Sequence, residues 1–582
     1  MLDFVIRGNI IFKNNLWKSQ MICQVQGKFD AFLMKEGINQ NMTVGLAMER
    51  TPILLISIMS LLNQGILFFP INKEVPPKRL QYMLETADVD CVITDGDWIK
   101  EMNLDCPITF FDIEIFDIEK NDVSMDKHIN KKEGKQELAY LLFTSGTTGK
   151  PKAVEVLRSG LINFIQAIMK RIEFPEETRI ICCTNEMFDI FFLESVLALH
   201  AGMTVVLADE NERKNPKKIC NLLLEQKVNV LQMTPSFLQM IHIVDREYCC
   251  LKNMDVIMVG GETFPVLLLE RLKSLSRARI YNMYGPTETT IWSLVADLSN
   301  STEIVIGQPI AKTEVFIIND QEEIVQEGVE GEICIAGAGL ARGYRNNGEQ
   351  TDVSFKCLSL GEKKIRVYKT GDMGYKRLDG NYVCLGRKDT QVKILGHRIE
   401  LEEIEQCVRE ISYIEDAVSC VYDDQNVKKI ICFYLSDEVP GIDDIREKLA
   451  DKLPSYMFPA TFVKVDNFIY TVSSKLDRNA MLHRYFETLK GKTKKEKVKK
   501  KDVEGWVKQS LSTFCGLEEE RLMPRTSIES LGMDSLMYIN FIVQSEDELK
   551  IEVDDEYLAS DSFSTVGDII EYFCKLCGSE IE

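Results

Sequence analysis

Residues 141–154 read Leu-Leu-Phe-Thr-Ser-Gly-Thr-Thr-Gly-Lys-Pro-Lys-Ala-Val, an apolar run that breaks into a turn rich in Gly, Ser and Thr. The apolar run predicts a buried strand. In the turn, small residues let backbone N–H groups approach a polyphosphate, and the hydroxyls and Lys150 or Lys152 add donors and positive charge. The order of a Walker loop, G-x-x-x-x-G-K-[ST], is not found in this stretch. The stretch therefore predicts a nucleotide site of another kind.

Length and net charge limit the classes of protein to which this chain can belong. The chain has 582 residues, enough for several domains of about 100–200 residues each. Its formal net charge of −21 argues against a general nucleic-acid binder. The first residues lack the basic region and cleavage pattern of a signal peptide, and the apolar runs 52–62 and 190–199 are too short to span a bilayer. We therefore expect a cytoplasmic protein that binds neither nucleic acid nor membrane.

The 17 cysteines follow no disulfide framework. In a cytoplasmic chain we expect them to be reduced and mostly buried. Cys574 and Cys577 form one C-x-x-C pair, but a zinc site needs a second pair of ligands and none is near. The five histidines are isolated in the sequence. The pattern therefore favours ordinary cysteines on a helix face over a metal site.

The character of the sequence changes along the chain. Strand-like runs such as 203–208 alternate with amphipathic stretches through the first ~380 residues, which predicts a layered α/β domain. A smaller unit follows, with a charged helix near 400–411 and a strand near 429–435. A Lys-rich run then reads as a solvated linker rather than a nucleic-acid patch, because no aromatic residue is interleaved. The predicted divisions are 1–388 (core), 389–487 (small subdomain), 488–502 (Lys-rich linker) and 503–580 (acidic helical unit).

The order T-S-G-T-T-G-x-P-K resembles the phosphate loop of the adenylate-forming superfamily, which comprises acyl-CoA ligases, luciferases and the adenylation domains of nonribosomal peptide synthetases. Further motifs similar to those of this family follow in the same order, and the resemblance covers about residues 40–485. It implies a large layered α/β adenylation core and a small α+β C-terminal subdomain. The matching motifs are 260–262 (Gly-Gly-Glu), 281–290 (Tyr-Asn-Met-Tyr-Gly-Pro-Thr-Glu-Thr-Thr), 331–344, 368–372 (Tyr-Lys-Thr-Gly-Asp), 386–389 (Gly-Arg-Lys-Asp) and 391–401.

The resemblance implies a role for each motif. Tyr284 would stack on the adenine base, Glu288 would hold Mg²⁺ through hard oxygen ligands, and Asp372 would accept both ribose hydroxyls. Arg387 would lie near the ribose, and Asp389 would be the hinge about which the small subdomain rotates between two half-reactions. The residues implied to bind ATP or AMP are Thr144, Ser145, Gly146, Thr147, Thr148, Gly149, Lys150, Lys152, Gly261, Glu262, Asn282, Tyr284, Gly285, Thr287, Asp372 and Arg387.

The catalytic lysine of this family lies on a loop near the end of the small subdomain, usually in a Gly-Lys-x-Asp context. Here residues 471–478 read Thr-Val-Ser-Ser-Lys-Leu-Asp-Arg, so Lys475 is in place and Ser474 replaces the glycine. A positioned ammonium would stabilise the negative charge that develops on the α-phosphate and carboxylate oxygens. The resemblance therefore implies Lys475, Glu288 and Thr144 as catalytic residues. Ala153 is a second departure, since the phosphate motif usually ends in glycine there.

Residues 188–194 read Phe-Asp-Ile-Phe-Phe-Leu-Glu, which places an acid inside an apolar run. A carboxylate there is costly to bury unless it is paired. In peptide-synthetase adenylation domains the aspartate at this position pairs with the α-ammonium of the substrate, so Asp189 implies an amino acid. The set of pocket positions resembles the pocket pattern of glycine-activating domains, and the physical argument agrees, since Leu193, two methionines and Trp292 can fill the space of a larger side chain. The pocket positions are Asp189, Ile190, Leu193, Gln232, Met258, Gly260, Met283, Ile291, Trp292 and Lys475.

Residues 531–536 read Leu-Gly-Met-Asp-Ser-Leu, and Ile539 continues the apolar spacing. This resembles the phosphopantetheine site of an all-α, four-helix carrier domain, with Ser535 at the start of a helix whose N-terminus suits an incoming phosphate. Taken alone, Ser535 fits equally well as an N-cap of an ordinary helix, but its place after an adenylating unit favours the carrier. The implied cofactors are ATP, Mg²⁺ and 4′-phosphopantetheine, which a phosphopantetheinyl transferase would attach to Ser535.

The leading interpretation is an AMP-forming ligase that makes glycyl-AMP and transfers glycine to its own carrier, in nonribosomal peptide or hybrid peptide–polyketide biosynthesis. One alternative is an acyl- or aryl-acid CoA ligase, which has no need of Asp189. Another is a non-catalytic scaffold that only tethers a carrier, which has no need of Lys475, Glu288 and Asp372. The sequence has no condensation-type His-His pair and no G-x-S-x-G elbow. We therefore expect condensation or ketosynthase domains as partners in trans, with an MbtH-like protein as a further candidate partner.

Overall fold

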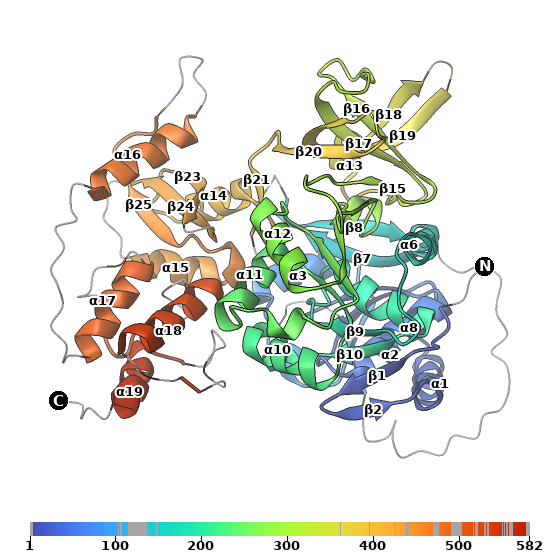
Figure 1. The fold of residues 1–582 in the computed structure, drawn as a ribbon, viewed down its shortest axis with the longest axis horizontal. Helices are drawn as coiled ribbons and strands as arrows, with labels where there is room; N and C mark the ends of the chain where they lie inside the picture. Colours follow the sequence, from blue (N-terminus) through green and yellow to red (C-terminus); the bar gives the residue numbers. More distant parts are fainter. Residues whose placement is uncertain are drawn as a thin grey trace.

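The computed structural model describes most of the chain (Figure 1). Thr147, Thr148 and Lys475 lie outside the described residues, as does the part 491–502 of the predicted linker. The described residues are 4–102, 104, 108–113, 137–146, 149–360, 363–394, 396–424, 427–436, 442–469, 476–490, 503–515, 517, 522–528, 531, 533, 535–549, 551, 553–554, 557 and 563–577.

The largest sheet has nine strands in the order β15-β14-β13-β12-β11-β9-β10-β1-β2. The strands from β13 to β1 run parallel, and β2, β14 and β15 pair antiparallel at the two ends. Parallel neighbours need crossover connections, so helices cover the sheet and its central strands are buried along most of their length. The strands are β1 (Asn9–Phe12), β2 (Asn15–Trp17), β9 (Arg179–Cys182), β10 (Thr204–Leu207), β11 (Val230–Met233), β12 (Val256–Gly260), β13 (Arg279–Tyr284), β14 (Leu294–Asp297) and β15 (Gln308–Pro309).

The second sheet has six strands in the order β6-β5-β3-β4-β7-β8. Strand β7 confirms the buried strand predicted at the start of 141–154, and the chain returns from the glycine-rich loop as antiparallel β8. Thr144 is the last residue of β7, so the loop starts directly at the end of a buried strand. The strands are β3 (Thr43–Ala47), β4 (Leu67–Pro70), β5 (Cys91–Thr94), β6 (Thr109–Asp112), β7 (Leu138–Thr144) and β8 (Lys152–Leu157).

Helices pack around both sheets of the large body (Figure 1). Helix α2 contains the apolar run 52–62 and is buried along almost its whole length. No helix in the described part of the chain is long and apolar enough to cross a membrane. Helix α7 runs through a π-helical turn, η1, into α8. The helices are α1 (Ser19–Lys35), α2 (Pro52–Gln64), α3 (Pro77–Thr86), α4 (Trp98–Glu101), α6 (Arg158–Arg171), α7 (Ile190–Phe192), η1 (Leu193–Leu197), α8 (Ala198–Ala201), α9 (Glu210–Lys214), α10 (Pro216–Glu225), α11 (Pro235–Val244), η2 (Cys249–Leu251), α12 (Val266–Leu275), η3 (Thr287–Thr289) and α13 (Gly348–Ser354).

A third sheet of five strands, β16-β17-β19-β18 with β20 beside β19, precedes the small subdomain. The hairpin β21–β22 and the sheet β23-β24-β25 follow, and α14 and β24 confirm the helix and strand expected near 400–411 and 429–435. The described part of the predicted four-helix carrier contains α17, α18 and α19. The bounds are β16 (Thr313–Ile318), β17 (Gly331–Gly337), β18 (Phe355–Leu360), β19 (Lys363–Lys376), β20 (Tyr382–Arg387), β21 (Gln391–Ile394), β22 (His397–Glu400), α14 (Leu401–Arg409), β23 (Asp416–Asp424), β24 (Val427–Leu435), α15 (Ile442–Ala450), η4 (Ser455–Met457), β25 (Thr461–Lys464), α16 (Arg478–Lys490), α17 (Val503–Cys515), α18 (Ser535–Leu549) and α19 (Val566–Cys577).

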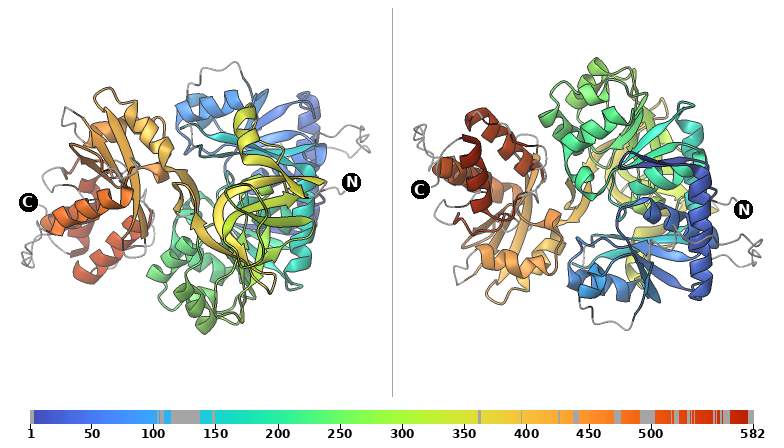
Figure 2. Two further views of the ribbon diagram at one scale, coloured as in Figure 1. Left: turned by 90° about the horizontal axis from the view of Figure 1, so that it is seen from above. Right: turned by 90° about the horizontal axis from the view of Figure 1, so that it is seen from below.

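The small subdomain and the carrier have apolar cores of their own. Ile399 and Ile404 belong to the core of the small subdomain, and Phe541 and Phe573 to that of the carrier. Both views of Figure 2 show these two units on one side of the large body. Because their buried clusters are separate, each unit can change its orientation without opening a core. The division points 388/389, 487/488 and 502/503 stay predictions.

Arg50 connects the two large sheets from a buried position. Its side chain is 2% exposed, and it donates to the carbonyl oxygens of Ala208 and Cys182 at 2.8 and 3.0 Å. Its Nη1 lies 3.0 Å from Glu186, whose other oxygen accepts from Asn72 at 2.6 Å. Each charge of this buried pair therefore has fixed polar partners, and removing one leaves the other uncompensated.

We predict that Arg50→Met lowers the free energy of unfolding of the large body by about 3–5 kcal/mol, because Glu186 is left as an unpaired buried charge. Urea unfolding of the full chain, followed by tryptophan fluorescence, measures the change. The surface variant Arg277→Met is the matched control and should stay within about 0.5 kcal/mol of wild type. A loss below about 1 kcal/mol for Arg50→Met would contradict the role given to this network.

Candidate active site

The predicted site residues converge on the carboxyl edge of the nine-stranded sheet. Gly260 ends β12, Tyr284 ends β13, and Gln232 is the last residue but one of β11. In open α/β sheets, ligands bind beyond the carboxyl ends of parallel strands. The hairpin β21–β22 of the small subdomain reaches the same edge, where the N–H of Gly396 donates to Glu262. The site is therefore built from the core and the small subdomain together.

The apolar pocket residues pack into one buried cluster. A Cβ at Gly260 would lie 2.8 Å from Cη2 of Trp292 and 2.9 Å from Cβ of Met283, so both side chains lie directly against the end of β12. Leu193 begins the π-helical turn η1, and such turns recur at functional sites because they re-aim the side chains that follow. The pocket residues that belong to this large core cluster are Leu193, Met258, Met283, Ile291 and Trp292, and Ile190 packs against it.

Two consecutive β-branched residues next to Trp292 have a strained backbone conformation. Thr290 and Ile291 have φ of 65° and 68°, in the left-handed region that such residues rarely adopt. Thr290 is held there because its hydroxyl donates to the carbonyl of Gly339 at 2.6 Å. The chain then passes so close to Gly285 that a Cβ there would lie 2.8 Å from Cα of Trp292. Strain of this kind persists only where the surroundings fix the backbone, and here it sets the position of the indole.

Among the buried polar atoms that lack a hydrogen-bond partner within the described residues, three belong to residues predicted for the site. They are Oε1 of Gln232 and Nε1 of Trp292 in the pocket, and Oγ1 of Thr144 at the phosphate loop. Buried polar groups in native proteins are almost always paired. These atoms are therefore places where a ligand would supply the missing partner.

Asp189 immediately precedes α7 and supplies the acidic group of the pocket. Burial raises the pKa of Asp189 to about 6, although a hydrogen bond from Thr287 and the charge of Lys393 act in the opposite direction. In the part of the chain that the structure describes, the carboxylate has no salt-bridge partner. A cationic group of a ligand would offset its desolvation, so the position fits an ammonium.

The ribose and hinge positions are linked through one guanidinium. Tyr284 donates from its hydroxyl to Asp372. Nη1 of Arg387 lies 3.3 Å from Asp372, while its Nε and Nη2 lie 2.8 and 2.5 Å from the two oxygens of Asp389. Strands β19 and β20 pair Asp372 with Arg387 directly, which fixes this arrangement. The structure thus brings together Tyr284, predicted for the base, with Asp372 and Arg387, predicted for the ribose, and Asp389, predicted as the hinge.

Glu288 is the most deeply buried acid of the site. Its side chain is 0% exposed, and both of its oxygens accept from Nη1 of Arg398, at 2.9 and 3.0 Å. Tyr344 donates to it at 2.8 Å. Burial alone would raise the pKa of Glu288, but the charges of Arg398 and Lys152 outweigh burial and hold the pKa at about 2. The predicted metal ligand is therefore ionised and, in this arrangement, paired with a cation from the small subdomain.

The phosphate loop also contacts the small subdomain. Ser145 donates from its hydroxyl to the carbonyl of Arg398 at 2.8 Å, and the N–H of Gly146 donates to Glu403 at 3.3 Å. Gly149 has φ of 74°, and a Cβ there would lie 2.1 Å from Oε1 of Gln406. Helix α14, which carries both Glu403 and Gln406, therefore packs directly on the loop.

Other predicted nucleotide-binding residues have protein partners in this structure. Glu262 accepts from the N–H of Ser236 at 3.1 Å, and burial raises its pKa. Asn282 donates to the carbonyl of Val305 at 2.8 Å. The exposed Lys150 lies 5.2 Å from the ring centre of Tyr82. The structure thus places part of this set in contact with neighbouring protein groups at the edge of the site.

The buried Lys152 and the backbone at Gly261 complete the predicted nucleotide set. Burial lowers the pKa of Lys152, repulsion from Arg398 lowers it further, and its ammonium lies 5.0 Å from the ring centre of Tyr344. Gly261 has φ of 87°, a left-handed conformation that favours glycine. Both features fit close approach of a charged ligand to the backbone.

Sequence reasoning missed the roles of Arg398, Glu403 and Tyr344. Arg398 and Tyr344 lie within motifs quoted above, but motif spacing alone does not name their partner. Glu403 lies beyond the last of those motifs. Each of the three is a charged or polar residue within or shortly after a motif, and only the folded chain shows which core residue it contacts.

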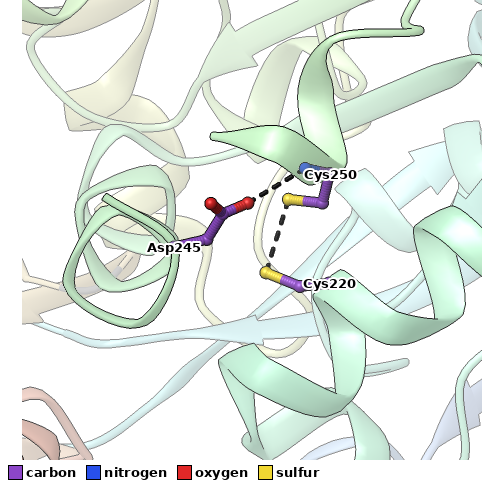
Figure 3. Close-up of side chains that lie close together, drawn as sticks. All are labelled: Cys220, Asp245 and Cys250. Carbon is purple, nitrogen blue, oxygen red and sulfur yellow. Dashed lines mark hydrogen bonds between the residues drawn. The ribbon is translucent and has the colours of Figure 1, made fainter. Parts of the chain in front are cut away.

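Cys220, Asp245 and Cys250 form the one group of three metal-ligating side chains in the described part of the chain (Figure 3). The two sulfur atoms lie 3.4 Å apart, and the N–H of Cys250 donates to Asp245 at 2.9 Å. The group comes from α10, the end of α11 and η2, none of which carries a predicted site residue. The cysteines that the structure describes are free thiols, most of them buried, as predicted.

The carrier approaches the core near the site. Ser535 is the first residue of α18, and α18 packs against α11 (Figure 1). Thr234 caps the start of α11 through a hydrogen bond from Phe237 N–H at 3.3 Å. A Cβ at Gly396 of the hairpin would lie 2.8 Å from Cγ2 of Thr234. The carrier thus packs on a helix whose first turn borders the hairpin.

Comparison with protein families gives two matches. The family described as "AMP-binding enzyme" matches residues 27–345, a range that contains the phosphate loop, Asp189 and Glu288. The family described as "Phosphopantetheine attachment site" matches residues 505–573, a range that contains Ser535.

Individual proteins match most of the chain. The dimodular nonribosomal peptide synthase of Bacillus subtilis (strain 168) is 35% identical over 461 residues, which cover 77% of this chain and 19% of the synthase. The solved structure of holo-PA1221, a peptide-synthetase protein with adenylation and PCP domains bound to a vinylsulfonamide inhibitor, shares the fold with a TM-score of 0.79 and 22% identity over 97% of this chain and 93% of that one. Holo-AB3403, a four-domain nonribosomal peptide synthetase bound to AMP and glycine, gives a TM-score of 0.60 and 27% identity over 98% of this chain and 42% of that one. The chain thus spans about a fifth of the length of the Bacillus relative.

Proposed function

We propose, on the premise that this chain belongs to the family of AMP-binding enzymes, that it activates an amino acid as aminoacyl-AMP and then loads it onto its own carrier. The chain consists of an adenylation domain of the peptide-synthetase type followed by a phosphopantetheine-binding carrier domain. We infer the substrate class from the acidic residue of the pocket, Asp189. Asp189 has no salt-bridge partner among the described residues, and its raised pKa reflects a charge that needs a cation.

An amino acid supplies that cation and the carboxylate to be activated. Its α-ammonium would pair with Asp189, and its carboxylate would then lie toward the phosphate loop at Thr144 and Ser145. Acyl- and aryl-acid CoA ligases bind substrates without an ammonium, so in them a carboxylate at this position would remain unpaired and costly. The alternative ligase function is therefore disfavoured by the charge of Asp189 itself.

Glycine is the proposed amino acid. Trp292 and Met283 lie against Gly260 at the end of β12, and strained backbone at Ile291 fixes the indole there. A rigid wall near the substrate α-carbon would reject side chains by steric clash, which is stronger than the modest gain that a pocket obtains per added methylene. A peptide synthetase crystallised with AMP and glycine, holo-AB3403, shares 27% identity with this chain and agrees with this choice.

The nucleotide side fits ATP and Mg²⁺. Glu288 is ionised and buried beside the phosphate loop, which suits a hard oxygen ligand for the metal. When bound, the metal would supply positive charge to the phosphates. Asp372 and Tyr284 would hold the ribose and the base, and Lys475 would stabilise the charge that develops during adenylation. In the present arrangement the hairpin β21–β22 occupies the site, which supports a second half-reaction after rotation about Asp389.

The carrier would receive the activated amino acid. Ser535 begins α18, so an attached phosphopantetheine would start from a helix N-terminus that favours its phosphate. The packing of α18 on α11 supports delivery of the thiol to the hairpin side of the site. We propose a cytoplasmic setting, a phosphopantetheinyl transferase as modifying enzyme, and condensation or ketosynthase domains as acceptors in trans, with an MbtH-like protein as a candidate activator.

The ionisation of Asp189 predicts that KM for glycine depends on pH. Its pKa of about 6 in the free chain is raised above the ordinary value, so the carboxyl binds a proton as pH falls through 6 and loses its attraction for the ammonium. We predict that KM for glycine in pyrophosphate exchange rises about tenfold between pH 7 and pH 5. In Asp189→Asn, KM should be high at both pH values and independent of pH. A wild-type KM that is flat over this range would contradict the role of Asp189.

The position of the Trp292 indole predicts which amino acids the pocket accepts. Trp292→Ser should open space beside Gly260 and raise kcat/KM for alanine relative to glycine by about tenfold or more, as expected for room for one methyl group. Wild type should prefer glycine, with alanine second and serine weaker. Pyrophosphate exchange with each amino acid gives the ratios. Trp17→Ser, on the edge strand β2, is the control and should leave the ratio unchanged; an unchanged ratio in Trp292→Ser would show that the indole does not set the size of the pocket.

The carrier assignment predicts the site of modification. After treatment with a phosphopantetheinyl transferase, wild type should gain the mass of one phosphopantetheine group and then accept glycine as a thioester. Ser535→Ala should gain neither mass, yet its pyrophosphate exchange should persist because adenylation needs no thiol. Ser564→Ala, at an exposed serine before α19, is the matched control and should load as wild type does. Intact-mass measurement decides, and a mass gain on Ser535→Ala would refute the assignment.

A further inference from the structure

Cys220, Asp245 and Cys250 bring two sulfur ligands and one carboxylate together outside the active site (Figure 3). Their ligand atoms all lie within 4.8 Å of one another, and the two sulfur atoms lie 3.4 Å apart. Both thiols are buried, since Cys220 is 6% and Cys250 is 2% exposed, and Asp245 is half-buried. The adenylation chemistry proposed above uses none of these three side chains.

The spacing of the sulfur atoms is close to that of two thiolates on one metal ion. Zinc holds thiolates at about 2.3 Å in tetrahedral geometry, which sets the two sulfur atoms about 3.8 Å apart. The observed 3.4 Å differs from that spacing by about 0.4 Å, whereas a disulfide bond of about 2.0 Å would require an approach of about 1.4 Å. Small side-chain rotations therefore suffice for a metal, and the neighbouring carboxylate supplies a third ligand.

The turn between Asp245 and Cys250 places both side chains beside Cys220. Tyr248, within this turn, has φ of 48°, a left-handed conformation that bulky residues rarely adopt. It is held there because its hydroxyl donates to the carbonyl of Leu238 and its N–H to the carbonyl of Asp245, both at 2.9 Å. The N–H of Cys250 donates to the carboxylate of Asp245 at 2.9 Å, and hydrogen bonds of this kind orient a carboxylate that binds a metal.

The mixture of ligands selects the metal. Mg²⁺ and Ca²⁺ bind hard oxygen ligands and do not favour thiolates, and an iron–sulfur cluster takes four protein ligands. Thiolate, imidazole and carboxylate are the ligands of zinc in proteins. With three protein ligands, the fourth position of a tetrahedral zinc ion is taken by water.

We propose that Cys220, Asp245 and Cys250 bind one Zn²⁺ ion as two thiolates and one carboxylate, with water as the fourth ligand. Binding forms two Zn–S bonds and one Zn–O bond and releases the two thiol protons to solvent, with no transfer of electrons. The ion cross-links α10, the end of α11 and η2. Because the carrier packs on α11 and η2 leads into β12, which ends at Gly260, the ion steadies the connection between the carrier-binding helix and the pocket strand.

The first test measures zinc binding to the full chain, reduced with a phosphine and without ATP or amino acid. Competition with a chromogenic chelator should show one tightly bound Zn²⁺ per chain. Cys220→Ser and Cys250→Ser should each weaken binding by about 100-fold or more, and Asp245→Asn by about tenfold, because even an indirect partner of a metal contributes about 10–100-fold. Wild-type affinity no tighter than that of Cys220→Ser would overturn the proposal.

Two matched controls separate the proposed ligands from other thiols. Cys249→Ser removes the exposed thiol next to Cys250, and Cys91→Ser removes a buried thiol in β5. Both should change the zinc dissociation constant less than twofold. A loss in Cys249→Ser as large as that in Cys250→Ser would overturn the three-ligand site, and the same loss in Cys91→Ser would show that any disturbed core abolishes binding.

The second test identifies the ligands and the segment that they hold. Co²⁺ in place of zinc should give sulfur-to-cobalt charge-transfer absorption, which should fall to about half in Cys220→Ser because one of two thiolates is lost. Zn²⁺ should slow hydrogen exchange of the amides in 245–251 at least fivefold in wild type and leave it unchanged in Asp245→Asn. Cobalt binding without this absorption, or exchange that zinc does not slow, would overturn the proposal.

These measurements are independent of the proposed function. None of them requires an amino acid, ATP or turnover, so a chain that does not activate glycine can still bind zinc at this cluster. If glycine is activated and loaded but zinc does not bind, only the zinc site is wrong.

Discussion

The need of one buried carboxylate for a cation governs the active site. Glu288 is shielded from solvent, which alone would raise its pKa, and the charges of Arg398 and Lys152 hold the pKa at about 2, so in this arrangement its ionisation depends on the cations beside it. One of these cations, Arg398, belongs to a different unit with a core of its own. A buried charge of the core is thus paired with the small subdomain, at the same interface where the hairpin contacts Glu262 and α14 contacts the phosphate loop.

The substrate pocket depends on a different constraint, the backbone rather than charge. Thr290 and Ile291 adopt a conformation that their side chains disfavour, and the surrounding hydrogen bonds and the close approach at Gly285 hold them there. The indole of Trp292 is consequently positioned by the chain itself and not only by its neighbours. A wall built in this way is stiff, which is what the proposed selection of glycine over alanine would require.

Local sequence patterns predicted many of the helices and strands. They did not predict the contacts between segments that lie far apart in the sequence. Strand β7, helix α14, strand β24 and the free cysteines were all expected from the sequence, because apolar runs, helical periodicity and composition act over a few residues. The pairing of Glu288 with Arg398 joins residues 110 positions apart, and that of Arg50 with Glu186 joins residues 136 apart. These residues become partners only when the units and sheets pack together. The spacing of the motifs carries no information about that packing. The role of Lys475 stays a prediction, since it lies outside the described residues.

The π-helical turn at Leu193–Leu197 has a consequence for how this pocket can diversify. A π turn holds one residue more than an α turn of the same rise, so it behaves as a single-residue insertion absorbed by a helix. Deleting one residue there would restore α-helical winding and rotate the preceding wall, including Leu193 and Asp189, relative to β12. A change of one residue in chain length at this turn would therefore re-aim the wall, and a position-by-position comparison of pocket side chains would miss it.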